Sequence, residues 1–300
     1  MRYLVTGASG FIGQSVVPEL LGAGHEVVGL VRSDASAAVV TGMGAEARRG
    51  DLDDLDGLRE AATAADGVLH LAFKHDLIAT GDFAGAGAAN MLAVEAIGDA
   101  LKGSGKSFVI VGGTLMLAVV AGRPGTEDDV LEEGPRIDAE NAVIALADDG
   151  VRSSVVRLPP LVHGPSDHGF GPALIGIARR HGFSGYVEDG ANRWPSVHVA
   201  DAARLCRLAL EQAPAGSRLH AVADEGVPFR EIAEAIGRGA DLPVKSVVAE
   251  DAPAHFGFLG GLVGLDNPVS AARTGELLGW RPTGPGLLED LGEGHYFEQA

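Results

Sequence analysis

The residues best suited to proton transfer follow a predicted strand. His75 and Asp76 come directly after Phe73 and Lys74, just beyond an apolar run at residues 67–72. Histidine titrates near neutral pH and a neighbouring carboxylate can orient it, so His75 is a candidate catalytic acid or base. A solvated polar turn is the alternative interpretation of the same stretch.

Two further histidines lie on a loop rich in proline and glycine. His163 and His168 flank Gly-Pro-Ser-Asp, shortly after an apolar run at residues 153–158. Ligands of open α/β sheets bind at the carboxyl ends of the strands, which places this loop beside a ligand. His163 is a second catalytic candidate and His168 a candidate substrate contact. Their spacing permits metal ligation, but no third or fourth ligand is close in the sequence, so we expect no metal.

Aromatic residues later in the chain are candidates for lining a substrate cleft. Trp194, with His198 nearby, and Phe256 would suit an apolar or planar ligand. Core packing is the alternative for both aromatics, and His198 can equally orient a loop.

The elements that must position these residues alternate between two periodicities. Short, continuously apolar runs are typical of strands buried on both faces, and helical stretches separate them. The predicted strands are residues 3–6, 26–31, 67–72, 107–112 and 153–158, and the predicted helices are residues 11–21, 55–62, 88–101 and 139–147. This order predicts an α/β fold with a doubly wound parallel sheet. We place a domain boundary near residue 160, with a nucleotide-binding domain at residues 1–160. A smaller substrate-binding α/β part follows at residues 161–300, and a segment near 219–223 can return to the main sheet.

A glycine turn joins the first predicted strand to the first predicted helix. The stretch reads Val-Thr-Gly-Ala-Ser-Gly-Phe-Ile-Gly, with glycines at 7, 10 and 13. Gly7 permits a tight turn, Gly10 allows a pyrophosphate to approach the backbone, and Gly13 allows close helix–strand packing. The helix N-terminus then offers free N–H groups to the phosphates. The turn therefore predicts a dinucleotide site.

Five motifs in order resemble the extended, epimerase/dehydratase-like branch of the short-chain dehydrogenase/reductase superfamily, which implies a Rossmann fold. They are Gly50-Asp51-Leu52, His70-Leu71-Ala72, the 157–165 stretch Arg-Leu-Pro-Pro-Leu-Val-His-Gly-Pro, the 196–201 stretch Ser-Val-His-Val-Ala-Asp, and the 278–282 stretch Leu-Gly-Trp-Arg-Pro, and they follow the glycine turn at Thr6–Gly13, which carries the same resemblance. In the third motif, His163 takes the place of a family tyrosine. The cofactor contacts that the resemblance implies are Gly7, Ser9, Gly10, Phe11, Ile12, Gly13, Asp51, Leu52, Leu71, Ala72, Phe73 and Pro159.

The end of the second predicted strand should lie at the adenosine ribose. Superfamily members that prefer NAD carry an acidic residue there. Here the place is Val31, followed by Arg32 and Ser33, and a guanidinium beside a hydroxyl suits a 2′-phosphate. A surface arginine is common at a strand end, and Asp34 could serve as the ribose acid. We favour NADP(H) over NAD(H).

The usual catalytic pair of this superfamily is missing. Active members resemble one another in a Tyr-x-x-x-Lys pair, whose tyrosine exchanges a proton with the substrate. None of the three tyrosines here is followed four residues later by lysine. In the extended branch a glutamate commonly follows that lysine by four residues. Taking Glu140 as this residue places Arg136 at the lysine position and Glu132 at the tyrosine position.

Arg136 can bond the nicotinamide ribose but cannot act as a proton shuttle. Pro135 predicts that a helix starts there and leaves Glu132 in a loop. The family's hydroxyl-bearing residue after the fifth strand would be Thr114, which is a further catalytic candidate, with an ordinary turn residue as the alternative. This pattern resembles the atypical reductases of the superfamily.

Composition restricts the partners. The 300 residues are 46% hydrophobic and carry a formal net charge of −18, which would repel nucleic acid and anionic membranes. The single cysteine, Cys206, suits a reducing compartment. No apolar run reaches the roughly 18 residues that span a bilayer, and the first residues show no leader. We expect a soluble cytoplasmic protein, a monomer or homodimer, that acts on a small molecule.

Three functions remain open at this point. The first is an NADP(H)-dependent reductase of a small carbonyl substrate, with the proton supplied by His75, His163 or water. The second is a sugar-nucleotide epimerase or dehydratase, against which the missing tyrosine counts. The third is a redox sensor that binds NADP(H) without turnover.

Overall fold

Seven strands form the main sheet of the computed structural model, which describes residues 1–79, 81–120, 122–134 and 136–298. They are β1 (Arg2–Thr6), β2 (Glu26–Val31), β3 (Glu46–Arg49), β4 (Gly67–His70), β5 (Ser107–Gly113), β6 (Arg152–Leu158) and β10 (Ser217–His220). All neighbours are parallel, and the order across the sheet is β10-β6-β5-β4-β1-β2-β3. The direction of winding reverses between β1 and β4, which is the point where doubly wound sheets bind ligands.

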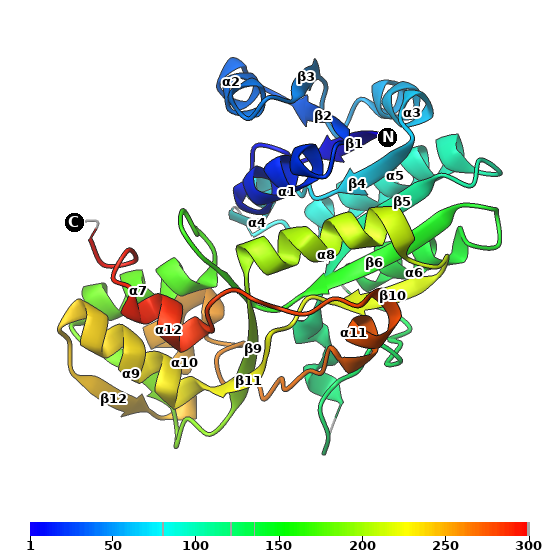
Figure 1. Cartoon of the computed structure of the whole chain (residues 1–300). Coiled ribbons are helices and arrows are strands. Elements are labelled where there is room, and N and C mark those ends of the chain that lie inside the picture. Colours follow the sequence, from blue (N-terminus) through cyan, green and yellow to red (C-terminus); the bar gives the residue numbers. More distant parts are fainter. Residues whose placement is uncertain (80, 121, 135, 299–300) are drawn as a thin grey trace.

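Helices cover both faces of this sheet (Figure 1), which is why its central strands are buried and mostly apolar. One face carries α1 (Phe11–Gly22), α2 (Asp34–Gly42) and α8 (Val199–Gln212). The other carries α3 (Leu55–Ala64), α5 (Phe83–Leu101) and α6 (Ile137–Ala145). The short α4 (His75–Ala79) follows β4, and η1 (Thr114–Val119) follows β5. The predicted α/β Rossmann architecture is therefore confirmed.

A smaller part lies below the carboxyl edge of the sheet (Figure 1). Its strands are β7 (Leu161–His163), β9 (Arg193–His198) and β11 (Asp224–Pro228), in the order β11-β9-β7, and the pair β8 (Ser184–Val187) and β12 (Val244–Val247). Its helical elements are α7 (Phe170–His181), α9 (Phe229–Ala240), η2 (Ala249–Asp251), α10 (Ala252–Phe256), η3 (Gly257–Leu259) and α12 (Leu287–Gly292). These elements enclose a separate hydrophobic core around Trp194, Phe229 and Phe256.

The chain crosses between the two parts more than once. After β9 it returns to the main sheet as α8, which packs against α1, and as β10, which extends the sheet beside β6. It then re-enters the smaller part at β11, and α11 (Ala272–Leu278) lies against α8 and β10. Residues 199–220 thus belong spatially to the nucleotide-binding sheet, although they follow residue 160 in the sequence.

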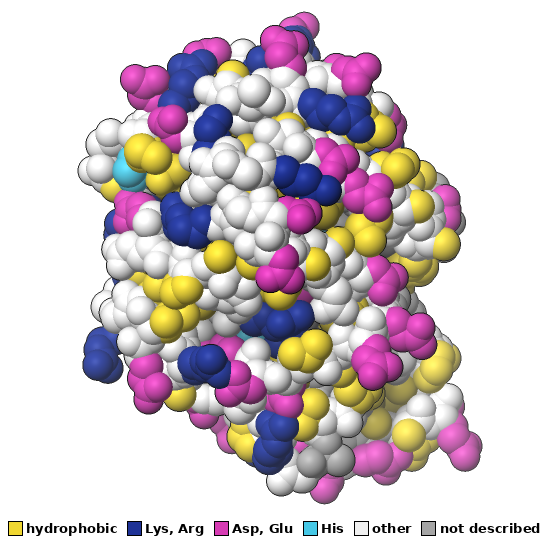
Figure 2. Space-filling model, turned by 90° about the vertical axis from the view of Figure 1, so that its right-hand side faces the viewer, with side chains coloured by type: hydrophobic (Ala, Val, Ile, Leu, Met, Phe, Trp, Pro, Cys, Tyr) yellow, Lys and Arg dark blue, Asp and Glu magenta, His cyan; other side chains and the backbone are white. Residues whose placement is uncertain are grey.

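The surface is mixed in charge. Acidic and basic side chains are interspersed over the face drawn in Figure 2. Among the described residues, no helix combines the length and apolarity needed to cross a bilayer.

Candidate active site

The glycine turn between β1 and α1 has a backbone that only glycine allows at two positions. Gly7 has φ +72°, and a Cβ added there would lie 2.8 Å from the backbone nitrogen of Ala72. A Cβ at Gly13 would lie 2.2 Å from the carbonyl oxygen of Gly7. A side chain at either position would collide with backbone rather than with a movable group. The turn is therefore pressed against the end of β4, at the switch point of the sheet.

The first turn of α1 is open to an anion. Gly10 caps the helix without a side chain and is exposed, and no acidic residue lies in the first turn. The first N–H groups of a helix have no partner within it, and they carry the positive end of the helix dipole. The backbone of Gly10 itself is held by a hydrogen bond from its N–H to the Gly7 carbonyl, at 3.0 Å. This cradle fits the pyrophosphate of a nicotinamide dinucleotide.

A buried hydrogen-bond chain joins β1 to β4 beneath this turn. The Ala72 N–H donates to Thr6 Oγ1 (3.2 Å), Thr6 Oγ1 lies 2.8 Å from His70 Nδ1, and His70 Nε2 lies 3.2 Å from Asn90 Oδ1. If Nε2 carries the proton that bonds Asn90, then Nδ1 accepts the Thr6 hydroxyl proton and every group is satisfied. Burial lowers the pKa of His70 to about 4, which agrees with this neutral form.

Two arginines lie at the ends of β2 and β3, where the sequence predicts the adenosine of a dinucleotide. Arg32 is exposed after β2, and Ser33 caps α2 by accepting the Ser36 N–H at 3.1 Å. Asp34 forms an ion pair with Arg49, at the end of the neighbouring β3. The carboxylate that could have served as a ribose acid is thus already paired with a cation.

The loop after β3 lies at the end of the neighbouring strand β2. The Gly50 N–H donates to the Val31 carbonyl at 3.2 Å, which holds the loop against the end of β2. Asp51 accepts the Asp53 N–H at 3.1 Å, and Leu52 is buried in the core. The sequence-predicted contacts Arg32, Asp51 and Leu52 therefore follow adjacent strand ends.

Arg136 and His75 both lie against Phe73, where the sequence predicts the nicotinamide ribose. The Arg136 guanidinium carbon lies 4.5 Å from the centre of the Phe73 ring, and its Nη2 donates to the Val111 carbonyl at 3.3 Å. The centres of the Phe73 and His75 rings are 5.6 Å apart, and the two rings pack edge to face. Burial, and then the charge of Arg136, lower the pKa of His75. The structure thus brings together a fixed cation and a neutral imidazole at the carboxyl end of β4.

Arg136 reaches this position from an unusual backbone conformation. It lies immediately before α6 with φ +71°, the left-handed region that a non-glycine residue rarely adopts. Such a conformation persists only where surrounding contacts hold it. The predicted helix start at Pro135 falls outside the described residues, and α6 begins at Ile137. Glu132 lies in the exposed segment before the helix.

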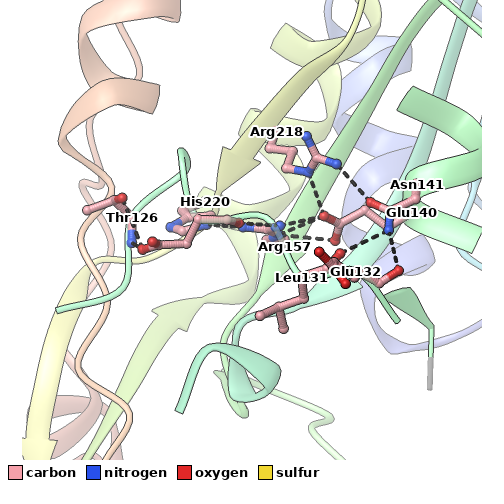
Figure 3. A network of polar contacts seen from close by, with 9 residues as sticks. Thr126, Leu131, Glu132, Glu140, Asn141, Arg157, Arg218 and His220 are labelled. Atoms are coloured by element: carbon pink, nitrogen blue, oxygen red, sulfur yellow. Dashed lines mark hydrogen bonds and ion pairs between the residues drawn. The ribbon is translucent and has the colours of Figure 1, made fainter. Parts of the chain in front are cut away.

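The contacts that hold α6 are centred on Glu140 (Figure 3). Glu140 is fully buried and accepts two hydrogen bonds from Arg157, at 3.0 Å from Nε and 2.5 Å from Nη2. Arg218 of β10 adds a third at 2.8 Å and also donates to Asn141. One carboxylate therefore faces two guanidinium groups from two adjacent strands.

This network reaches the segment that carries Arg136. The Asn141 amide donates to the carbonyls of Leu131 and Glu132, at 3.0 and 3.2 Å. Arg157 also lies 3.3 Å from Nε2 of His220, whose Nδ1 lies 2.8 Å from the Ser270 carbonyl. Burial lowers the pKa of His220, so this ring can be neutral and accept from Arg157. The network thus fixes the helix and the segment before it as one unit.

The loop after β7 also reaches the cofactor turn. The His168 ring lies 5.7 Å from the ring of Phe11, the first residue of α1, in an edge-to-face contact. His163 is buried, and its Nδ1 lies 2.8 Å from Oδ2 of Asp290. Its Nε2 has no hydrogen-bond partner among the described residues. Of the two histidines, His168 is the one that touches the nucleotide-binding turn.

Of the remaining candidate residues, three are buried and one caps a helix. Thr114 is buried, and its hydroxyl is 3.5 Å from the side-chain oxygen of Asn267. Trp194 and Phe256 are buried in the core of the smaller part. His198 caps α8 by accepting the Ala200 N–H at 3.3 Å. As catalytic or substrate contacts, these four residues stay predictions.

The other expected cofactor contacts follow the same edge. Ser9 accepts a hydrogen bond from Gln14 through its carbonyl, and Ile12 packs against the core beneath α1. Leu71 donates its N–H to the Thr6 carbonyl at 3.2 Å, and Pro159 is buried directly after β6.

Several contacts in the structure give no signal in the sequence. The Thr6, His70 and Asn90 chain and the Asp34–Arg49 pair join residues on different elements.

Asp290, Glu293 and His295 bring possible metal-ligating atoms within 4.8 Å of one another, although sequence spacing predicts no metal.

A doubly wound parallel sheet with a glycine turn at its switch point defines a dinucleotide-binding protein. Residues 3–222 match the family model described as the NAD dependent epimerase/dehydratase family. The chain belongs to this family, and with it to the extended short-chain dehydrogenase/reductase superfamily that its motifs indicate.

Individual relatives agree with this assignment. A protein of Schizosaccharomyces pombe described as uncharacterized is 45% identical over 99% of this chain and 100% of its own length. A 2-alkyl-3-oxoalkanoate reductase of Stenotrophomonas maltophilia is 29% identical over 77% of this chain and 73% of that protein. The fold is similar to that of a dTDP-glucose 4,6-dehydratase of Streptomyces venezuelae solved with NAD, with a TM-score of 0.77 and 22% identity over 99% of this chain and 96% of that chain.

Proposed function

We propose that the protein is an NADP(H)-dependent reductase of a small carbonyl substrate that works without the usual catalytic tyrosine. The observation that carries this proposal is the meeting of Arg136, Phe73 and His75 at the end of β4, beside the glycine turn. Similarity to a reductase of 3-oxo acids supports the reaction class. When bound, NADPH supplies the hydride that the carbonyl carbon receives.

The residues of this chain would then bind, orient and supply a proton. The glycine turn and the α1 N-terminus hold the pyrophosphate, and Arg136 holds the nicotinamide ribose. The carbonyl oxygen takes one proton for each hydride that the carbon takes, and His75, whose ring packs edge to face against Phe73, is the candidate that would supply it. His163 and water are the other candidate sources of this proton.

A preference for the 2′-phosphate is supported by charge. Arg32 is exposed directly after β2, whose last residue Val31 pairs with Arg49 of β3, and Arg49 forms an ion pair with Asp34. A phosphate here would meet two guanidinium groups, whereas a free ribose hydroxyl would meet a carboxylate that is already paired. We therefore favour NADPH over NADH.

The pH dependence of turnover tests the role of His75. Its lowered pKa makes the neutral form dominant at pH 7, so turnover that needs the protonated ring rises as the pH falls below the usual value of 6.5. Turnover that needs only water shows no such rise.

The direct experiment measures NADPH binding and NADPH oxidation with a panel of small ketones and 3-oxo acids. Consumption of NADPH with one of them supports the reductase. Tight NADPH binding with no turnover over the whole panel would instead indicate the redox sensor, and epimerisation or dehydration of a sugar nucleotide would indicate the other enzyme class.

A further inference from the structure

A loop of the smaller part lies against the nucleotide-binding turn. It joins β7 to α7 and spans residues 164–169. Its His168 ring packs edge to face against the Phe11 ring, with 5.7 Å between the ring centres. Phe11 opens α1, whose free N–H groups form the phosphate cradle. The position of this loop therefore bears directly on the cofactor site.

The loop has a backbone that needs support from outside. Gly164 has φ +142° and Ser166 has φ +68°, so a non-glycine residue lies in the left-handed region. Within the loop, the Asp167 N–H donates to the Gly164 carbonyl at 3.1 Å, and Oδ1 of Asp167 accepts the Gly169 N–H at 2.7 Å. The second oxygen of Asp167 is left to bond a residue elsewhere in the chain.

That residue comes from the C-terminal segment. The Tyr296 hydroxyl accepts the Gly164 N–H at 2.9 Å and donates to Oδ2 of Asp167 at 3.0 Å. One hydroxyl thus joins both ends of the turn through its single donor and one of its acceptor sites. At the start of the same loop, His163 bonds Asp290 of α12 at 2.8 Å, with both side chains buried.

Tyr296 is itself held in place by its neighbour. The Phe297 ring packs directly over Gly239 of α9, where an added Cβ would lie 2.2 Å from the ring. The Phe297 carbonyl accepts a hydrogen bond from Arg179 of α7 at 3.2 Å. The segment is therefore anchored on two helices of the smaller part, and Tyr296 extends from that anchor to the loop.

We propose that Tyr296 is a positioning residue, which holds the loop at residues 164–169 so that His168 packs against Phe11 over the bound nucleotide. The proposal rests on the proposed function, because it assigns the loop a role in cofactor binding. It explains why a hydroxyl 128 residues from His168 in the sequence meets a loop whose backbone is otherwise strained.

Tyr296→Phe removes the hydroxyl and keeps the ring. Tyr186→Phe, on β8, is the matched control, because its half-buried ring lies under Arg230, in the smaller part. Amide hydrogen exchange in the free protein should become at least three- to tenfold faster at residues 164–169 of Tyr296→Phe, with the rest of the chain unchanged, because the variant loses both hydrogen bonds of the hydroxyl and a single lost bond already corresponds to that range. The dissociation constants for NADPH and for NADH should rise by a similar factor, and Tyr186→Phe should match wild type in both measurements.

A double substitution separates positioning from general stability. His168→Ala should weaken nucleotide binding by about as much as Tyr296→Phe, and adding Tyr296→Phe to His168→Ala should cause no further loss. Additive losses, or unchanged exchange at residues 164–169 in Tyr296→Phe, would overturn the proposal. Wild-type protein that prefers NADH would refute only the proposed cofactor preference. Wild-type protein that binds neither nucleotide would refute the proposed function, and the positioning role with it.

Discussion

Protonation of His70 is expected to destabilise the fold at the switch point of the sheet. The ring is 2% exposed and lies between Thr6 and Asn90, where one nitrogen accepts and the other donates. A second proton on the ring would take the place of the Thr6 hydroxyl proton between Nδ1 and Oγ1, so the hydroxyl would lose the acceptor that it donates to. The folded protein therefore holds His70 neutral, while the unfolded chain lets it charge.

The size of this loss in the free energy of unfolding follows from the shift in the pKa of His70. Burial lowers the pKa of His70 from 6.5 to about 4. The unfolded chain thus binds a proton between these two values that the folded chain does not, so stability falls as the pH decreases through this window. A shift of about 2.5 units at about 1.4 kcal/mol each corresponds to a loss of roughly 3 kcal/mol by pH 4, with the full contribution present above pH 6.5.

Urea unfolding of wild type and His70→Gln between pH 7.5 and pH 4 measures this contribution. Glutamine retains a donor and an acceptor but does not titrate. The free energy of unfolding of wild type minus that of His70→Gln should therefore be constant above pH 6.5 and fall by roughly 3 kcal/mol by pH 4. The other histidines cancel in this difference, and low protein concentration avoids association near the isoelectric point of about 4.8. His181→Gln, on the exposed end of α7, should follow the wild-type curve. A constant difference over the whole range would refute the neutral His70.

Three other substitutions test the site. Gly13→Ala places a Cβ 2.2 Å from the Gly7 carbonyl, so NADPH binding should weaken by at least about tenfold in a fluorescence titration, and unchanged affinity would contradict the close approach. Glu140→Gln removes the carboxylate between two guanidinium groups, so the free energy of unfolding should fall by about 3–5 kcal/mol in urea, whereas the exposed Glu132→Gln should change it by less than about 0.5 kcal/mol. His75→Ala should lower kcat by about a hundredfold and leave the dissociation constant for NADPH within twofold, and unchanged turnover would remove His75 from the mechanism.

The architecture could be predicted because its signals are local. Strands β1, β4 and β5 are apolar along nearly their whole length, a pattern that burial on both faces produces, and the glycine turn lies between one of them and a helix. Nothing in the sequence pattern predicts β3, which reads Glu-Ala-Arg-Arg and lies at the edge of the sheet, where polar side chains meet solvent.

The candidate site, like the fold, could be predicted from the sequence only in part. The residues at the β4 end and before α6 could be named because motifs lie close to them in the sequence. The contact of His163 with Asp290 and that of Gly164 with Tyr296 join residues 127 and 132 positions apart. Such pairs leave no periodic trace, and only the folded chain brings them together.

Binding of the two nucleotides tests both the dinucleotide site and its preference for the 2′-phosphate. Dissociation constants for NADPH and NADH should be measured for wild type, Arg32→Ala and the control Arg59→Ala, which changes an exposed arginine of α3. Wild type should bind NADPH more tightly than NADH, Arg32→Ala should weaken binding of NADPH by about 1–3 kcal/mol and of NADH by much less, and Arg59→Ala should change neither. Equal losses for both nucleotides in Arg32→Ala, or tighter binding of NADH by wild type, would contradict the preference for the 2′-phosphate.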